Sequence, residues 1–252
     1  MTLGSIQALM LGAFALGAFG LCGFAGCGTP PGVFIIVQNQ VLTPMCTVPA
    51  TLGTDYRGEG TLDLRLVDDS PEAGYMLFPL LQNDFPPAGG EVDGNRIALS
   101  GFDVDIGLPS NSPPGVLTDA FTAMQTSSDI GGADPLIEYS TLTSGSVASG
   151  GGNTASSVTI FPGPLAARIR AMGVLSPTKH FWVMASVRAR GKTLANDVRS
   201  DAFKYPIELC DGCLVVDTGA CSATNTPGGG GCTPGQDSFS ACCEVTGTLT
   251  CQ

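Results

Sequence analysis

The sequence predicts an all-β fold: an immunoglobulin- or fibronectin-like antiparallel β-sandwich with a small disulfide-rich C-terminal tail. Three observations support this fold class. Apolar and polar residues alternate with a period of two in several segments between residues 33 and 209, as expected of strands with one buried face. The chain contains 35 glycines and 18 prolines, which typically separate short strands by turns. Seven of the ten cysteines lie after residue 209.

Residues 1–26 are expected to form a signal peptide, because they carry no charge and are apolar almost throughout. They end in Phe24-Ala25-Gly26-Cys27, which resembles the lipobox of bacterial lipoproteins. That resemblance implies cleavage before Cys27, lipidation of its thiol and a firm membrane anchor made of several fatty chains. It also implies transfer to the outer membrane, since Gly28 stands where the inner-membrane retention signal has Asp. Secretion after a small residue near Gly26 and an uncleaved membrane anchor are the alternatives.

Residues 27–209 are expected to form the sandwich body. Leu62, Leu64 and Leu66 alternate with Asp63 and Arg65. The same alternation marks residues 181–190 and 203–209, and further strands are expected at 33–42, 75–81, 136–142 and 157–161. One-sided strands of this kind belong to antiparallel sheets.

One strand changes phase. Ile97 and Leu99 are apolar at odd positions, whereas Phe102, Val104 and Ile106 are apolar at even positions. An inserted residue would restore the inward face, so the sequence predicts a β-bulge or a sharp bend at Gly101.

Two segments of the body are expected to lack strands. Residues 109–135 are rich in Pro, Gly, Ser and Asp, and a linker near 108–135 would join two packed halves if the body is not one sandwich. Residues 144–154 form a Gly/Ser-rich loop.

Pro164–Met172 is the only helix that the pattern supports, with Leu165, Ile169 and Met172 on one stripe.

Residues 210–252 are expected to be held together by disulfides, because they contain too few apolar residues for a core. If Cys22 leaves with the leader and Cys27 carries lipid, eight cysteines remain. The number in the tail is odd, so one of them needs a partner in the body, where Cys46 is available. We predict a bond from Cys46 to Cys210 or Cys213. The eight are Cys46, Cys210, Cys213, Cys221, Cys232, Cys242, Cys243 and Cys251.

The chain resembles uncharacterised myxobacterial exported lipoproteins over most of residues 30–243. The resemblance lies in the segments Gly60-Thr-Leu-Asp-Leu64, Tyr75-Met-Leu-Phe-Pro-Leu-Leu-Gln-Asn83, Asn95-Arg-Ile, Gly101-Phe102, Tyr205-Pro-Ile-Glu-Leu-Cys-Asp-Gly-Cys213 and Gly235-Gln-Asp237. It implies a surface location and a cysteine-rich end, and it supplies no catalytic residue.

The sequence shows no catalytic or metal motif. His180 is the single histidine, no Gly-x-Ser-x-Gly elbow accompanies it, and a lone histidine at a strand edge is expected to face solvent. Cys210-Asp-Gly-Cys213 has the spacing of a zinc or redox pair, but no second pair and no βαβ pattern accompany it. We therefore expect no metal and no cofactor. A formal charge of −11 argues against nucleic acid as a partner.

Two acidic pairs are weaker candidates. Asp103 and Asp105 share one strand face and could hold calcium or flank a glycosidic bond, or simply protect a sheet edge. Asp68-Asp69, the next calcium candidate, precedes Pro71 and is expected to form a turn.

Basic residues gather in residues 168–204, which carry eight basic and two acidic side chains. Within this segment Trp182, Met184, Arg188 and Arg190 share a strand face, which could bind a protein or glycan partner. The basic charge could equally complement the acidic remainder of the chain, and we favour that explanation. The sequence thus predicts a non-enzymatic cell-surface lipoprotein with a structural or adhesive role. The alternative is an extracellular carbohydrate-binding protein or a hydrolase that uses exposed carboxylates.

Overall fold

The computed structural model describes residues 33–67, 70, 73–89, 92–126, 133–223, 226–229, 231–246 and 248–251. The expected leader, the lipidation of Cys27 and the turn at Asp68-Asp69 lie outside these residues. In the described part of the chain, no helix has the length and apolar character needed to span a bilayer.

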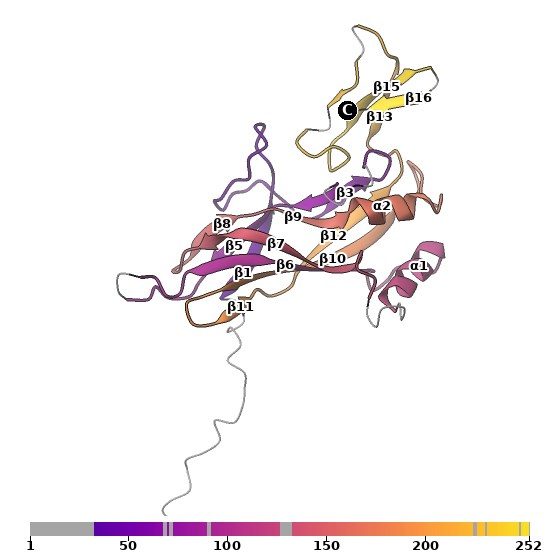
Figure 1. The fold of residues 1–252 in the computed structure, drawn as a ribbon. Helices are drawn as coiled ribbons and strands as arrows, with labels where there is room; N and C mark the ends of the chain where they lie inside the picture. Colours follow the sequence, from indigo (N-terminus) through magenta and orange to yellow (C-terminus); the bar gives the residue numbers. More distant parts are fainter. Residues whose placement is uncertain are drawn as a thin grey trace, which may run out of the picture.

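The body consists of two main sheets with a shared core (Figure 1). One sheet has the order β2-β1-β5-β8, with bounds Tyr56–Arg57, Phe34–Gln40, Pro79–Asn83 and Gly152–Ala155. The larger sheet has the order β3-β12-β10-β6-β7, and β11 pairs with β10. Its strands span Gly60–Asp63, Phe203–Cys210, Phe181–Lys192, Ile97–Gly107, Glu138–Val147 and Asp197–Arg199. A two-stranded sheet, β4 (Gly74–Leu77) and β9 (Val158–Pro162), completes the body.

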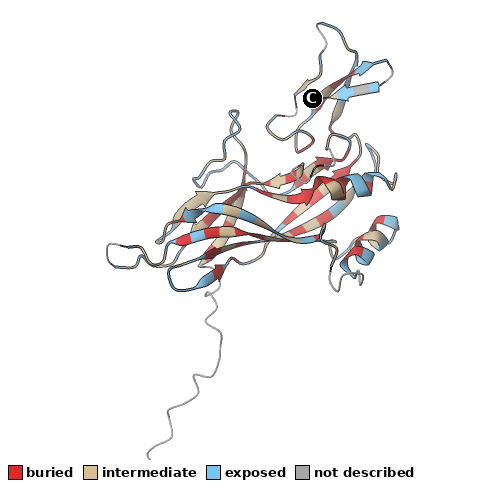
Figure 2. Cartoon of the chain, in the orientation of Figure 1, coloured by how far each residue is buried: buried red, intermediate tan, exposed pale blue. Residues whose placement is uncertain are grey.

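The predicted all-β sandwich-like fold is confirmed. Side chains from both main sheets meet in one hydrophobic core, including Phe34, Leu81, Val104, Val187 and Tyr205. Figure 2 shows buried and accessible positions alternating along the strands of the larger sheet. Pairing within the body is antiparallel except between β12 and β3, which run parallel. The segment 108–135 connects β6 to β7, which are neighbours in the same sheet.

The predicted bend in the long strand is confirmed. The register of β6 against both of its neighbours shifts between Leu99 and Gly101. Gly101 has φ 155°, and a Cβ there would overlap the carbonyl oxygen of Thr141. The apolar residues on both sides of the shift consequently face the same core, including Ile97 and Phe102.

Several sequence expectations need correction. The single strand expected at 75–81 is two strands, β4 and β5, in different sheets. The loop expected at 144–154 contains the end of β7 and the strand β8. Asp63, expected on a solvent-facing side, is fully buried because it accepts hydrogen bonds from backbone amides of the tail.

The helices are two, not one, in the described residues. The expected helix is α2 (Gly163–Arg170), which buries Leu165, Ala166 and Ile169. The second, α1 (Val116–Gln125), lies in the segment interpreted as a linker, and buries Leu117, Phe121 and Met124. These three residues recur at intervals of four and three, which is a helical stripe. The sequence indicates a linker here because the Pro, Gly and Ser residues around the helix favour turns.

The tail forms a separate small sheet at one end of the body (Figure 1). Its order is β13-β15-β14, with β16 paired to β15. The bounds are Val215–Ala220, Ser240–Val245, Gly228–Gly229 and Thr248–Cys251. Cys242 and Cys243 are fully buried in this small sheet, and Leu214 and Ser240 of the tail are also buried.

The prediction of disulfides is confirmed, and one predicted pairing is wrong. The bonds are Cys46–Cys232, Cys210–Cys213, Cys221–Cys243 and Cys242–Cys251. Cys46 thus bonds to the tail, as expected, but through Cys232 and not through Cys210 or Cys213. Cys210 is buried at the end of β12 and pairs with Cys213 three residues away, whereas Cys46 lies in the exposed loop after β1.

Candidate functional site

The outer face of the larger sheet is the side that carries Trp182, Met184, Arg188 and Arg190. The alternation of β10 directs these four residues away from the core, and Val183, Ala185, Val187 and Ala189 into it. Trp182 is 38% exposed, which is high for a residue of its size. The structure therefore places all four predicted residues on one side of the same strand, as expected.

Cross-strand register adds further charged residues to the outer face. Asp105 of β6 lies opposite Glu138 of β7 and opposite Ser186 of β10, and Ser186 lies opposite Lys204 of β12. This row of directly opposed residues therefore reads Glu138, Asp105, Ser186, Lys204 across four strands. Directly opposed side chains are about 5 Å apart at Cβ, so they interact.

The next row contains an ion-pair network centred on Asp103. The carboxylate of Asp103 lies 3.0 Å from Nε of Arg190 and 3.3 Å from a terminal nitrogen of Arg199, and it accepts a hydrogen bond of 2.7 Å from the Ser140 hydroxyl. The carboxylate of Asp103 is therefore already bound by side chains of the same chain. It does not act together with Asp105 as a free pair of carboxylates, which weakens the hydrolase and calcium interpretations.

The favoured explanation of the basic segment holds for four of its arginines. Arg168 pairs with Asp134, Arg170 with Asp211, and Arg190 and Arg199 with Asp103. All three acids lie outside residues 168–204. Arg188 and Lys204 are exposed and form no ion pair with the described residues.

An open hollow of about 660 Å³ lies over these rows. Its walls are polar and charged, since it is lined by Asp103, Val104, Asp105, Ala133, Glu138, Tyr139, Ser140, Ser186, Arg188 and Arg199. Asp105 and Glu138 are exposed acids directly opposite one another, an arrangement that costs stability unless a cation is nearby. The outer face therefore offers unpaired charge of both signs, with Met184 and Trp182 farther along β10.

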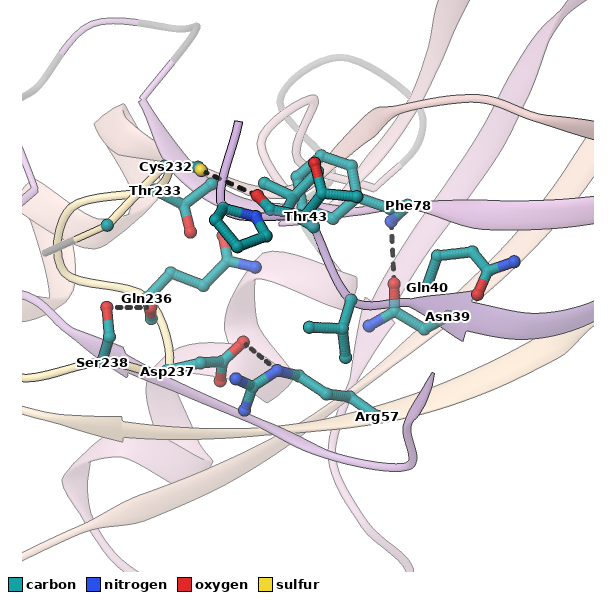
Figure 3. A pocket seen from close by; sticks show the side chains of 14 residues that line it. Asn39, Gln40, Thr43, Arg57, Phe78, Cys232, Thr233, Gln236, Asp237 and Ser238 are labelled. Atoms are coloured by element: carbon teal, nitrogen blue, oxygen red, sulfur yellow. Dashed lines mark hydrogen bonds and ion pairs between the residues drawn. The ribbon is translucent and has the colours of Figure 1, made fainter. Parts of the chain in front are cut away.

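A second recess, of about 300 Å³, lies where the tail meets the body (Figure 3). It is lined by the end of β1 and the loop after it, by Arg57 and Phe78, and by tail residues 231–233 and 236–238. No alternation or catalytic motif in the sequence predicts this recess. Gly235-Gln-Asp237 supplied its only sequence signal, as part of the family resemblance.

The polar groups of this recess bind one another and the backbone. One carboxylate oxygen of Asp237 accepts from the Thr61 amide at 2.7 Å; the other accepts from the Tyr75 hydroxyl at 2.7 Å and lies 3.6 Å from Nε of Arg57. The Gln236 side chain bonds both the amide and the carbonyl of Met76. We call the contacts of Gln236 and Asp237 with the body the tail junction.

Two tyrosines extend the tail junction into the core. The hydroxyls of Tyr75 and Tyr205 lie 2.8 Å apart, and both side chains are fully buried. Burial, followed by the nearby charge of Asp237, raises the pKa of Tyr75, and burial raises the pKa of Tyr205 to about 12. Both phenols therefore stay protonated and donate hydrogen bonds at physiological pH. The arrangement fits a structural role, in which these groups fasten the tail.

Other predicted candidates are not brought together with these two sites. His180 is exposed, as expected, and its ring nitrogens lie 2.8 Å from a Glu208 carboxylate oxygen and 2.9 Å from the Pro177 carbonyl oxygen. In the described residues, Asp63, Cys210 and Cys213 form the one cluster of three potential metal ligands within 4.8 Å. The two sulfurs are bonded to each other, so they are not thiolate ligands.

Comparison with protein-family models, with curated proteins and with solved structures finds no match to this chain.

Proposed function

We propose that this chain is an exported, lipid-anchored surface protein that binds a partner through the outer face, without catalysis. The observation that carries the proposal is an exposed sheet face on which Asp105, Glu138, Arg188 and Lys204 have no ion-pair partner among the described residues. Charge without an internal partner is available for recognition. Trp182, 38% exposed, adds an aromatic anchor of the kind that is enriched at interfaces.

Four disulfides support the exported location. Such bonds persist outside the cytosol, where thiols are not kept reduced. The anchor is tested by mass spectrometry of the mature chain from its native host. We expect an acylated N-terminal Cys27; an intact chain that begins at Met1 with an unmodified Cys27 would contradict it.

A carbohydrate ligand is the second candidate. The hollow of the outer face combines carboxylates, serine hydroxyls and arginines, which are the groups that bind sugar hydroxyls, and Trp182 could stack on a sugar ring. A hydrolase remains the weaker version of this candidate, because Asp103 is held by two arginines.

The binding role is tested with Trp182→Ala and Arg188→Ala variants of the full chain, measured on a glycan array and in whole-cell binding. Arg96→Ala and Leu194→Ala serve as matched controls, since both residues are exposed and lie away from the outer-face rows. We expect the two outer-face variants to lose most of the binding, and the controls to retain it. Equal binding by all four variants would refute the outer face as the binding surface.

A further inference from the structure

The charges of the outer face are arranged in a self-complementary pattern. In the three rows that include Asp105, Asp103 and Gly101, the acids lie on β7 and β6, and the bases lie on β10, β12 and β11. The two further acids on the basic side are paired within the chain, Glu208 with His180 and Asp197 with Lys192. The boundary between the two halves runs between β6 and β10, parallel to the strands. A twofold axis along this boundary would turn a second copy over and lay its basic half on the acidic half of the first. We infer that the partner of the outer face is a second copy of this chain.

The residue rows match under this operation. In the row Glu138, Asp105, Ser186, Lys204, the outermost positions exchange, so that Glu138 faces Lys204 of the second copy. Lys204 of the first copy then faces Glu138 of the second. Every contact in such an interface occurs twice, because the same patch is used on both copies.

The two following rows are compatible with the same axis. Asp103 lies opposite Arg188 within the sheet, so the axis places Arg188 of one copy over Asp103 of the other. Leu142, which is 90% exposed, lies on β7 opposite Gly101, and Arg190 lies opposite Arg199 on the basic side. Leu142 then faces Arg199 of the second copy, whose methylene groups it can cover.

The available area suits an interface of modest strength. Four strands at about 4.8 Å and an eleven-residue β6 give a face on the order of 700 Å² per copy. This is close to the size of standard specific interfaces. Exposed charge pairs contribute more to orientation than to affinity. Many copies anchored on a surface would strengthen such contacts by avidity, which fits an adhesive role.

This inference rests on the proposed function, because it names the partner of the same face. The test is sedimentation equilibrium of the full chain in density-matched detergent, with the variants Glu138→Lys, Lys204→Glu and the double variant. All substituted residues are exposed, so the fold should be retained. The charge-reversal controls are Glu59→Lys and Lys179→Glu, which are exposed and lie outside the strands that form the three rows.

We expect a dimer for the native chain. Each single variant should weaken it by about tenfold or more, since two like-charge contacts arise per interface. The double variant should restore it. An equal mixture of the two single variants should form a one-to-one heterodimer, because both outermost positions of the row are then basic on one copy and acidic on the other. The controls should dimerise like the native chain.

A native chain that stays monomeric, or a dimer that the charge swap leaves unchanged, would overturn the inference. The proposed function can hold even when this inference is wrong. If the native chain is a monomer and its outer-face variants lose glycan or cell binding, only the second-copy partner is disproved. Dimers that respond to the charge swap, combined with no glycan binding, would support the second copy over a carbohydrate.

Discussion

Asp63, which is fully buried, and Asp237, whose side chain is 7% exposed, link the body and the tail, because each accepts hydrogen bonds from the other segment. Asp63 of the body accepts hydrogen bonds from tail amides at Gly212 (2.6 Å) and Leu214 (2.7 Å). Asp237 of the tail accepts one from the body amide of Thr61 (2.7 Å) and one from the Tyr75 hydroxyl. Hydrogen bonds to an ionised acceptor are stronger than neutral ones. The body thus provides the carboxylate that accepts from tail amides, and the tail provides the carboxylate that accepts from donors of the body.

Replacement of Asp237 by Asn should destabilise the protein by about 1.5–3 kcal/mol, because a charged acceptor of buried donors is lost. The measurement is urea unfolding in oxidising buffer, read as a lower midpoint at an unchanged slope. Asp55→Asn is the control, since Asp55 is exposed. A midpoint equal to that of the native chain would show that the tail junction does not hold the tail.

His180 should make stability fall slightly as the pH rises above about 6.5. The Pro177 carbonyl, followed by the Glu208 carboxylate, accepts from its ring and raises the pKa of His180 above its usual value. A raised folded-state pKa gives stability that is complete below the unfolded pKa of about 6.5 and is lost as pH rises through the folded value. The effect should stay below about 1 kcal/mol, since the pair is solvent-screened.

The check is thermal unfolding of the native chain and of His180→Gln between pH 5.5 and 8.5 (values set around the unfolded pKa of about 6.5). The native chain should lose more stability than the variant across this range. Parallel pH profiles would contradict the expectation.

At the scale of elements, β6 shows how one residue positions a whole strand. Gly101 absorbs the register shift, so the apolar residues before and after it reach the same core. It also sets the outer face, because Asp103 and Asp105 project outward only after the shift. The site therefore depends on a backbone feature that the sequence pattern revealed.

Gly101→Ala should cost at least about 2 kcal/mol, because φ 155° strains a residue with a side chain and the Cβ would overlap the Thr141 carbonyl. Gly58→Ala is the control, since its Cβ would meet open space. Chemical unfolding measures both variants, and equal midpoints would disprove the strain argument.

The sequence predicted elements well where one periodicity dominated. Period-two alternation identified β10 and β12, and the change of phase located the bend in β6. It failed where local composition and long-range packing disagreed. Helix α1 lies among turn-forming residues, yet Phe121 stacks on Phe181 of β10 at 5.8 Å between ring centroids. That contact stabilises a helix that local propensity alone does not predict.

At the scale of the whole molecule, the disulfide that closes the longest loop imposes the largest covalent restraint. Cys46–Cys232 joins residues 186 positions apart, whereas Cys210–Cys213 joins residues three apart. Loop-closure entropy grows with the enclosed length. The long-range bond therefore holds the tail to the body, and the short-range bond shapes only its own turn.

Replacement of both Cys46 and Cys232 by Ser should lower stability by roughly 5 kcal/mol on the chain-entropy estimate. The paired Cys210→Ser and Cys213→Ser variant should lose less by the same estimate, and serves as the comparison. Thermal unfolding in oxidising buffer separates the two. A larger loss from the short-range pair would contradict this assignment of roles.

The sequence by itself determined the strand-rich class, the reliance on disulfides, the bend at Gly101 and the residues that share a face of β10. Each of these features follows from local alternation or from composition, and neither of these depends on tertiary contacts. Only the tertiary structure decided that Cys46 bonds Cys232, that Asp63 is buried and Asp237 contacts the body, and that Glu138, Asp105, Ser186 and Lys204 form one row. These depend on register between strands far apart in the chain, and a single sequence does not encode that register in any local pattern.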